Sequence, residues 1–74
     1  MPKYPVVKPY QIIKALNLLG FYEVRQKGSH KQFKHQDGRT TTIPDHKGRD
    51  ISPILLKQIL QEINVELDEF KKYL

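Results

Sequence analysis

The 74-residue chain contains no cysteine. This absence excludes disulfide bonds and thiolate metal sites, and it is typical of proteins in a reducing compartment. Long hydrophobic runs are also missing, because the apolar stretch at residues 12–19 is interrupted by Lys14 and Asn17. The sequence therefore predicts neither a signal peptide nor a membrane-spanning helix, and we expect a cytoplasmic protein with no membrane partner.

The length leaves room for one small domain. A chain of this size buries only about 60% of the surface that it exposes when unfolded, so a large enclosed active site is not expected. No repeat, linker or low-complexity segment divides the sequence, and residues 1–74 are predicted to form a single domain.

Positive charge is concentrated in the middle of the chain. The sequence has 13 Lys and Arg against 8 Asp and Glu, a net charge of +5. Residues 21–49 hold all three histidines, three acidic residues and seven of the cations: Arg25, Lys27, Lys31, Lys34, Arg39, Lys47 and Arg49. Such a field attracts a polyanion, and nucleic acid is the one we expect. A solvated basic face or an acidic protein partner would also account for the charge.

The first two elements differ in hydrophobic period. A helix over residues 9–19 is predicted from a buried stripe at helical spacing, formed by Ile12, Ile13, Leu16 and Leu19. Pro9 stands in its first turn and Gly20 in the left-handed position after its end. From residue 21 the pattern alternates. This alternation predicts a half-buried strand in which Tyr22 and Val24 face one way and the charged residues face the other.

Two turn signals predict a hairpin-linked sheet. Gly28-Ser29 leads into a second strand at residues 30–35, and Asp37-Gly38 joins that strand to a third, which Pro44 ends. Phe33 is predicted to face the core. The opposite face, which is expected to be exposed and shared with the cations of the first strand, carries His30, Gln32 and Lys34.

The remaining residues predict two more helices. After a polar loop at residues 45–49, Ser52 and Pro53 indicate the start of a helix, which Asn64 ends. Its predicted buried stripe is formed by Leu55, Leu56, Ile59, Leu60 and Ile63. A short last helix is predicted from Leu67, Phe70 and Leu74. The fold class is therefore α+β, with the order α-β-β-β-α and a short C-terminal helix. Its three-stranded antiparallel sheet carries both long helices on one face and leaves the other face exposed.

The segment from Arg25 to Lys31 has the residue types that phosphodiester chemistry requires. Imidazole titrates near neutral pH and transfers protons, lysine and arginine hold a phosphate, and glycine lets backbone N–H groups approach an oxyanion. We predict His30 as a general acid or base. The residues predicted to hold the phosphate or the RNA are Arg25, Lys27, Gly28, Ser29 and Lys31.

A series of short motifs extends along nearly the whole chain, over roughly residues 9–70. The motifs are Gly20-Phe21, Arg25-Gln26-Lys27-Gly28-Ser29-His30, Phe33, Asp37-Gly38-Arg39, Thr42-Ile43-Pro44, His46, Gly48 and Asp50-Ile51. In this order and spacing they resemble the HicA toxin family of type II toxin–antitoxin systems. Its members are small mRNA interferases with a fold like the double-stranded-RNA-binding domain, each blocked by a HicB antitoxin. The resemblance implies that His30 takes the place of the family's catalytic histidine and that a HicB-type partner covers the active face.

RNA carries its own nucleophile, the 2′-hydroxyl, so a protein that cleaves it needs neither a metal nor a cofactor. We therefore predict a metal-independent endoribonuclease that acts on mRNA, with one histidine as general acid or base and a 2′,3′-cyclic phosphate as product. The opposite proton transfer is expected to fall to Lys27 or to water.

Other interpretations stay open at this point. The alternative function is a non-catalytic RNA-binding module, because the same fold binds RNA without cutting it. A third interpretation is an interaction protein whose basic sheet docks an acidic partner. Gly28 and Ser29 have structural interpretations as turn residues. His46 in the polar loop could approach RNA, but a solvated loop residue is the commoner explanation. His35, which is predicted to face away from His30, is expected to be a partly buried structural residue, so the two histidines do not predict a zinc site.

Overall fold

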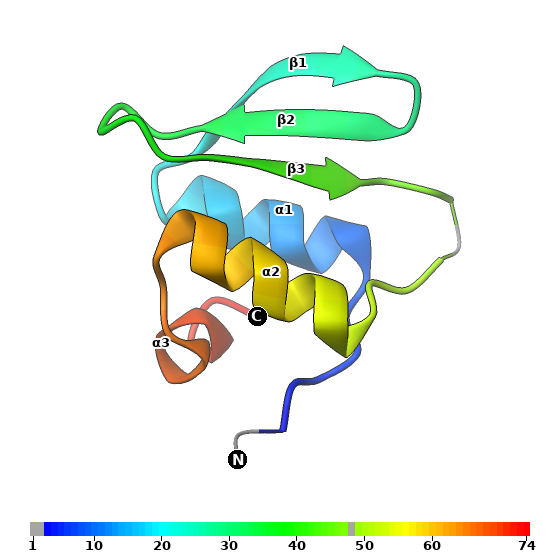
Figure 1. Ribbon diagram of the computed structural model, residues 1–74, viewed down its shortest axis with the longest axis vertical. Coiled ribbons are helices and arrows are strands. Elements are labelled where there is room, and N and C mark those ends of the chain that lie inside the picture. The colour runs from blue at the N-terminus through cyan, green and yellow to red at the C-terminus, as the bar shows by residue number, and fades with distance from the viewer. Residues whose placement is uncertain (1–2, 48) are drawn as a thin grey trace.

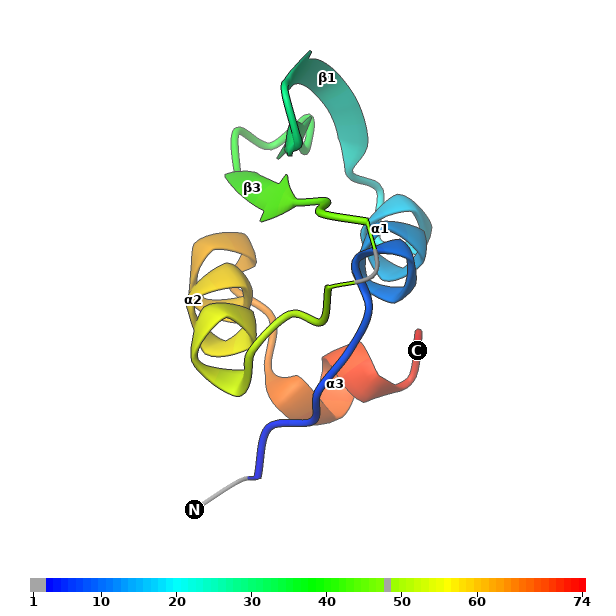
Figure 2. The ribbon, with the colours of Figure 1, turned by 90° about the vertical axis from the view of Figure 1, so that its right-hand side faces the viewer.

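The computed structural model describes residues 3–47 and 49–74. These residues form, in order, α1 (Pro9–Leu18), β1 (Tyr22–Lys27), β2 (His30–Lys34), β3 (Thr40–Pro44), α2 (Pro53–Ile63) and α3 (Leu67–Lys71), as Figure 1 shows. The sheet is antiparallel with strand order β1-β2-β3, and α1 and α2 lie on the same side of it (Figure 2). The predicted α+β fold is confirmed, and its topology is consistent with a double-stranded-RNA-binding domain. The motif residue Gly48 lies outside the described residues.

Helix α1 begins and ends as its sequence predicts. Pro9 is the first helical residue, and the Gln11 side chain accepts a hydrogen bond from the backbone N–H of Lys8 at 2.8 Å. Beyond the last turn Gly20 has φ +96°, and a Cβ at this position would lie 2.9 Å from His35 Nε2. Both the backbone conformation and the space therefore require glycine where α1 leads into the sheet.

Helix α2 has local signals at both ends. Ser52 Oγ accepts a hydrogen bond from the backbone N–H of Leu55 at 3.1 Å, and Pro53 is the first helical residue. Asn64 ends the helix in the left-handed conformation, with φ 57°. These caps satisfy backbone groups that have no partner within the helix, and both were predicted from the residue types.

The core lies between the sheet and the helices. Phe33 of β2 is 1% exposed, as predicted, and it packs with residues from α1, β3, α2 and α3. The largest of the other fully buried side chains are Phe70, Ile12, Leu16, Ile43, Leu56, Ile59 and Ile63.

Three details of the predicted core differ in the structure. Ala15 is fully buried in α1, whereas the predicted stripe residues Ile13 and Leu19 are only partly buried. Leu55 in α2 is also only partly buried. Leu74 is 41% exposed because α3 ends at Lys71 and the last residues no longer follow its buried side.

Strand β1 is not half-buried, so that prediction was wrong. Every residue of the strand is exposed, including Tyr22 at 48% and Val24 at 47%. The cause is position, because β1 is the edge strand farthest from the helices (Figure 1). A bulge between Glu23 and Arg25 also interrupts the regular pairing with β2. Strand β1 therefore projects beyond the layer that the helices cover.

Candidate functional site

The exposed face of the sheet brings together most of the residues predicted to act on RNA. His30 begins β2 and is exposed, and it pairs across the strands with Lys27. Arg25 pairs in the same way with Gln32. Because alternate residues of a strand share a face, these side chains stand on one side of the sheet. A shallow hollow of about 240 Å³ is lined by Arg25, Lys27, His30, Gln32 and Thr42.

The turn between β1 and β2 carries the next two predicted residues. Gly28 has φ +60°, which favours glycine, and a Cβ there would meet no atom within 4 Å. The Gly28 carbonyl accepts a hydrogen bond from Gln26 Nε2 at 3.1 Å. The Ser29 hydroxyl lies 3.4 Å from His46 Nε2. The turn is thus an open corner of backbone beside His30.

Lys31 is on the other face of the sheet. Its Nζ lies 3.0 Å from Asp45 Oδ2, and it lines a groove with Tyr10 and Ile13 of α1. The hydrogen bond that Lys31 donates to the Asp45 carboxylate raises the pKa of Lys31 above its ordinary value. Lys31 directly follows His30 in the sequence and was predicted to act with it, but adjacent residues of a strand point to opposite faces of the sheet. The structure therefore does not bring Lys31 into the hollow that His30 lines.

His35 has the structural environment that was predicted for it. Its ring packs edge-on against Phe21 with the ring centroids 5.1 Å apart, and its side chain is 19% exposed. Its Nδ1 accepts a hydrogen bond from the backbone N–H of Asp37 at 3.1 Å. His35 therefore belongs to the packing of the β2–β3 turn, away from His30.

Arg39 also has a structural role. Its Nε lies 2.8 Å from Asp37 Oδ2, its guanidinium group lies 5.0 Å from the centre of the Phe21 ring, and it donates a hydrogen bond to the Ile63 carbonyl at the end of α2. A cation at this place stabilises the C-terminus of a helix. The positive charge of Arg39 is thereby partly balanced, as the charge of Lys31 is.

The outer face carries cations that make no ion pair with the described acidic residues. Within the described ranges, Arg25, Lys27 and Lys34 make no ion pair, and all three are exposed. Arg25 and Lys27 flank the same hollow as His30. Their uncompensated charge makes this face of the sheet attractive to phosphate groups.

His46 lies in an exposed loop, as predicted. The sequence did not predict its closeness to His30: the two ring centroids lie 6.1 Å apart, with the ring planes at 79°. The pairing of β3 with β2 is the signal that could have indicated this contact. Pro44, the last residue of β3, pairs with His30 at the start of β2, so the residues after Pro44 lie close to His30.

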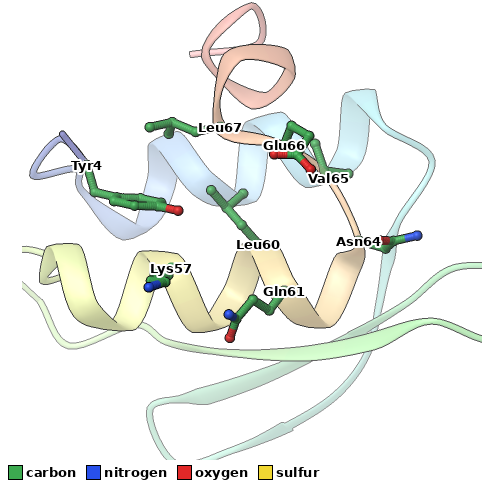
Figure 3. A pocket seen from close by; sticks show the side chains of 8 residues that line it. All are labelled: Tyr4, Lys57, Leu60, Gln61, Asn64, Val65, Glu66 and Leu67. Atoms are coloured by element: carbon green, nitrogen blue, oxygen red, sulfur yellow. The ribbon is translucent and has the colours of Figure 1, made fainter. Parts of the chain in front are cut away.

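A separate hollow of about 330 Å³ lies between α2 and the segment that leads into α3 (Figure 3). Its lining includes the aromatic ring of Tyr4 and one residue of each charge, Lys57 and Glu66, but nothing from the sheet. Over the part of the chain that the structure describes, no helix is long and apolar enough to cross a membrane. The same residues contain no group of three or more His, Asp or Glu side chains that could hold a metal ion.

Fold and surface together define a small α+β domain of double-stranded-RNA-binding topology, with a basic, histidine-bearing outer sheet face. A family model described as "HicA toxin of bacterial toxin-antitoxin" matches residues 10–65. The chain belongs to the HicA toxin family, as its motifs predicted. A search of curated proteins finds no match. Membership implies the toxin of a toxin–antitoxin pair, an mRNA interferase with an RNA substrate and a HicB antitoxin partner.

Proposed function

We propose that the protein is a metal-independent endoribonuclease that cleaves mRNA on the outer face of its sheet, with His30 as a general acid or base and no cofactor. The observation that carries this proposal is the grouping of His30 with Arg25 and Lys27 around one exposed hollow. An imidazole moves the proton while the two cations hold the phosphate, so the three side chains supply complementary parts of one reaction.

The reaction is an internal transfer within RNA. A base removes the proton of the 2′-hydroxyl, the 2′-oxygen bonds to phosphorus, and the bond from phosphorus to the 5′-oxygen breaks as that oxygen takes up a proton. The products are a 2′,3′-cyclic phosphate and a 5′-hydroxyl end. Proton transfer by a positioned side chain is typically worth about 10² to 10⁴ in rate, which sets the effect expected from His30.

The phosphate is held by cations and by the turn. Arg25 and Lys27 approach it from β1, and the backbone N–H groups at Gly28 and Ser29 offer donors to the oxygens that gain negative charge. Lys31 acts indirectly, from the other face of the sheet. Its ion pair with Asp45 holds in place the loop that follows β3.

The HicB-type antitoxin is expected to cover the same outer face. Strand β1 and the start of β2 are exposed there, and their cations favour a partner of complementary charge. An antitoxin seated on this face occludes His30 and excludes RNA at once. We place the enzyme in the cytoplasm, where its mRNA substrate is found.

Expression in cells tests the proposed function and its site together. We expect the wild type to arrest growth and to degrade total mRNA, and His30→Ala to do neither. Because His30 is exposed, the purified variant should keep the thermal midpoint of the wild type. Gln58→Ala, an exposed change on α2, is the control that should stay toxic. Full toxicity of His30→Ala would exclude His30, and intact mRNA with bound wild type would favour the non-catalytic module.

Metal independence has its own test. Because the proposed proton transfers use only side chains, cleavage of purified RNA should continue at an unchanged rate after dialysis against EDTA. Product lengths on a denaturing gel measure the rate. Loss of cleavage that added magnesium or zinc restores would contradict the metal-independent mechanism.

A further inference from the structure

Two histidines meet at one corner of the sheet, although they lie in different parts of the chain. His30 is the first residue of β2, and His46 lies two positions beyond the end of β3. Their ring centroids are 6.1 Å apart and the rings are nearly perpendicular, at 79°. Both side chains are exposed, so an RNA linkage lying over the corner would reach both.

We propose that His46 is the second proton-transfer group of the reaction, so that one imidazole acts as the base at the 2′-hydroxyl and the other as the acid at the leaving 5′-oxygen. This inference rests on the proposed ribonuclease function and goes beyond it, because that function needs only His30. His46 thus takes the proton transfer for which the sequence predicted Lys27 or water.

The loop that carries His46 is held close to the turn that carries His30. The Asp45 backbone N–H donates a hydrogen bond to the Ser29 carbonyl at 2.6 Å. The Asp45 side chain pairs with Lys31 at 3.0 Å. His46 therefore follows a residue with two contacts to the β1–β2 hairpin, and its ring is placed beside His30 before RNA binds.

The chemistry explains why two imidazoles suit this corner. In an in-line displacement the attacking and leaving oxygens stand on opposite sides of phosphorus, so one side chain rarely serves both. Two neighbouring rings of the same kind provide a neutral form that accepts one proton and a charged form that donates the other. Over one turnover the proton taken from the 2′-oxygen is balanced by the proton given to the 5′-oxygen.

A structural role is the competing explanation. The His46 Nε2 lies 3.4 Å from the Ser29 hydroxyl, so His46 could simply hold the turn in place. The variants His46→Ala and His46→Gln separate the two roles. Glutamine keeps a polar group beside Ser29 but cannot transfer protons near neutral pH, whereas alanine removes both properties.

The first measurement is single-turnover cleavage of an RNA with one mapped site by the full-length protein. We expect His46→Ala and His46→Gln each to slow cleavage by about 10² to 10⁴, with unchanged RNA affinity and thermal midpoint. Restoration of the wild-type rate by His46→Gln would overturn the inference, since hydrogen bonding alone would then be sufficient. A wild-type rate in His46→Ala would overturn it as well.

The second measurement uses the same RNA with sulfur in place of the 5′-bridging oxygen at the cleaved linkage. A thiolate leaves without a proton, so the variant that lacks the acid, whether at His30 or at His46, should recover most of the wild-type rate. The variant that lacks the base should stay slow. Recovery of both variants, or of neither, would contradict a base and acid pair. If the wild type leaves unmodified RNA intact, the proposed function itself fails, which is a different result from normal cleavage by His46 variants.

Discussion

At the scale of single residues, Asp37 organises the turn between β2 and β3. Its carboxylate accepts a hydrogen bond from the backbone N–H of Arg39 at 3.0 Å and from Arg39 Nε at 2.8 Å. Its own backbone N–H donates to His35 Nδ1. The hydrogen bonds from Arg39 favour the charged form of the Asp37 carboxylate. They lower the pKa of Asp37 below its ordinary value of 3.8, chiefly through the backbone N–H of Arg39.

The direction of this pKa shift predicts how stability changes with pH. Because the folded pKa is depressed, Asp37 stabilises the fold above its unfolded pKa of 3.8, and the contribution is lost as the pH falls through the lower folded value. Asp37→Asn should therefore lower the thermal midpoint at neutral pH, and its difference from the wild type should shrink in acid. Circular dichroism melts from neutral pH to about pH 2 measure this. A difference that stays constant would contradict the assignment.

At the scale of elements, local signals explain where the helices and turns lie, and long-range packing explains the rest. Ser52, Asn64 and Gly20 act on their own helix ends, so their residue types were sufficient to predict the boundaries. The exposure of Tyr22 depends on how far the helices extend beneath the sheet, which no pattern within β1 encodes. The position of His46 likewise depends on the pairing of β3 with β2.

The cap of α2 gives a prediction at this scale. Ser52→Ala removes the hydrogen bond to the Leu55 N–H and should lower the free energy of unfolding by about 1 kcal/mol. RNA cleavage should not change, because α2 lies beneath the sheet (Figure 1), whereas the residues of the proposed site line the hollow on its outer face. Urea denaturation followed by circular dichroism measures the loss. A stability equal to that of the wild type would show that the cap adds nothing.

At the scale of the whole molecule, the two faces of the sheet differ: one packs against the helices, and the other is the proposed RNA-binding face. The helices cover one face of the sheet and bury its apolar residues, which leaves the opposite face free for charge. Lys31 shows how strictly this division holds, since it neighbours His30 in sequence but pairs with Asp45 on the helix side. Which of the cations lie on the outer face could be predicted only by knowing the strand pairing and which face of the sheet the helices cover.

This division predicts which lysines contribute to RNA affinity. Lys27→Ala should weaken binding and lower the slope of log affinity against log salt by about 0.7, the value for one phosphate contact on a single strand. Lys57→Ala removes the same charge from α2 and should leave the slope unchanged. Fluorescence anisotropy with labelled RNA over a salt series measures both. Equal slopes for the two variants would place the RNA elsewhere.

The central claim is that His30 on the basic outer face cleaves RNA through the 2′-hydroxyl. The most direct measurement incubates purified wild type and His30→Ala with one RNA oligonucleotide and identifies the new ends by mass spectrometry. We predict 2′,3′-cyclic phosphate and 5′-hydroxyl ends with the wild type, and intact RNA bound at normal affinity with His30→Ala. Products that carry a 5′-phosphate, or equal cleavage by the two proteins, would contradict the claim.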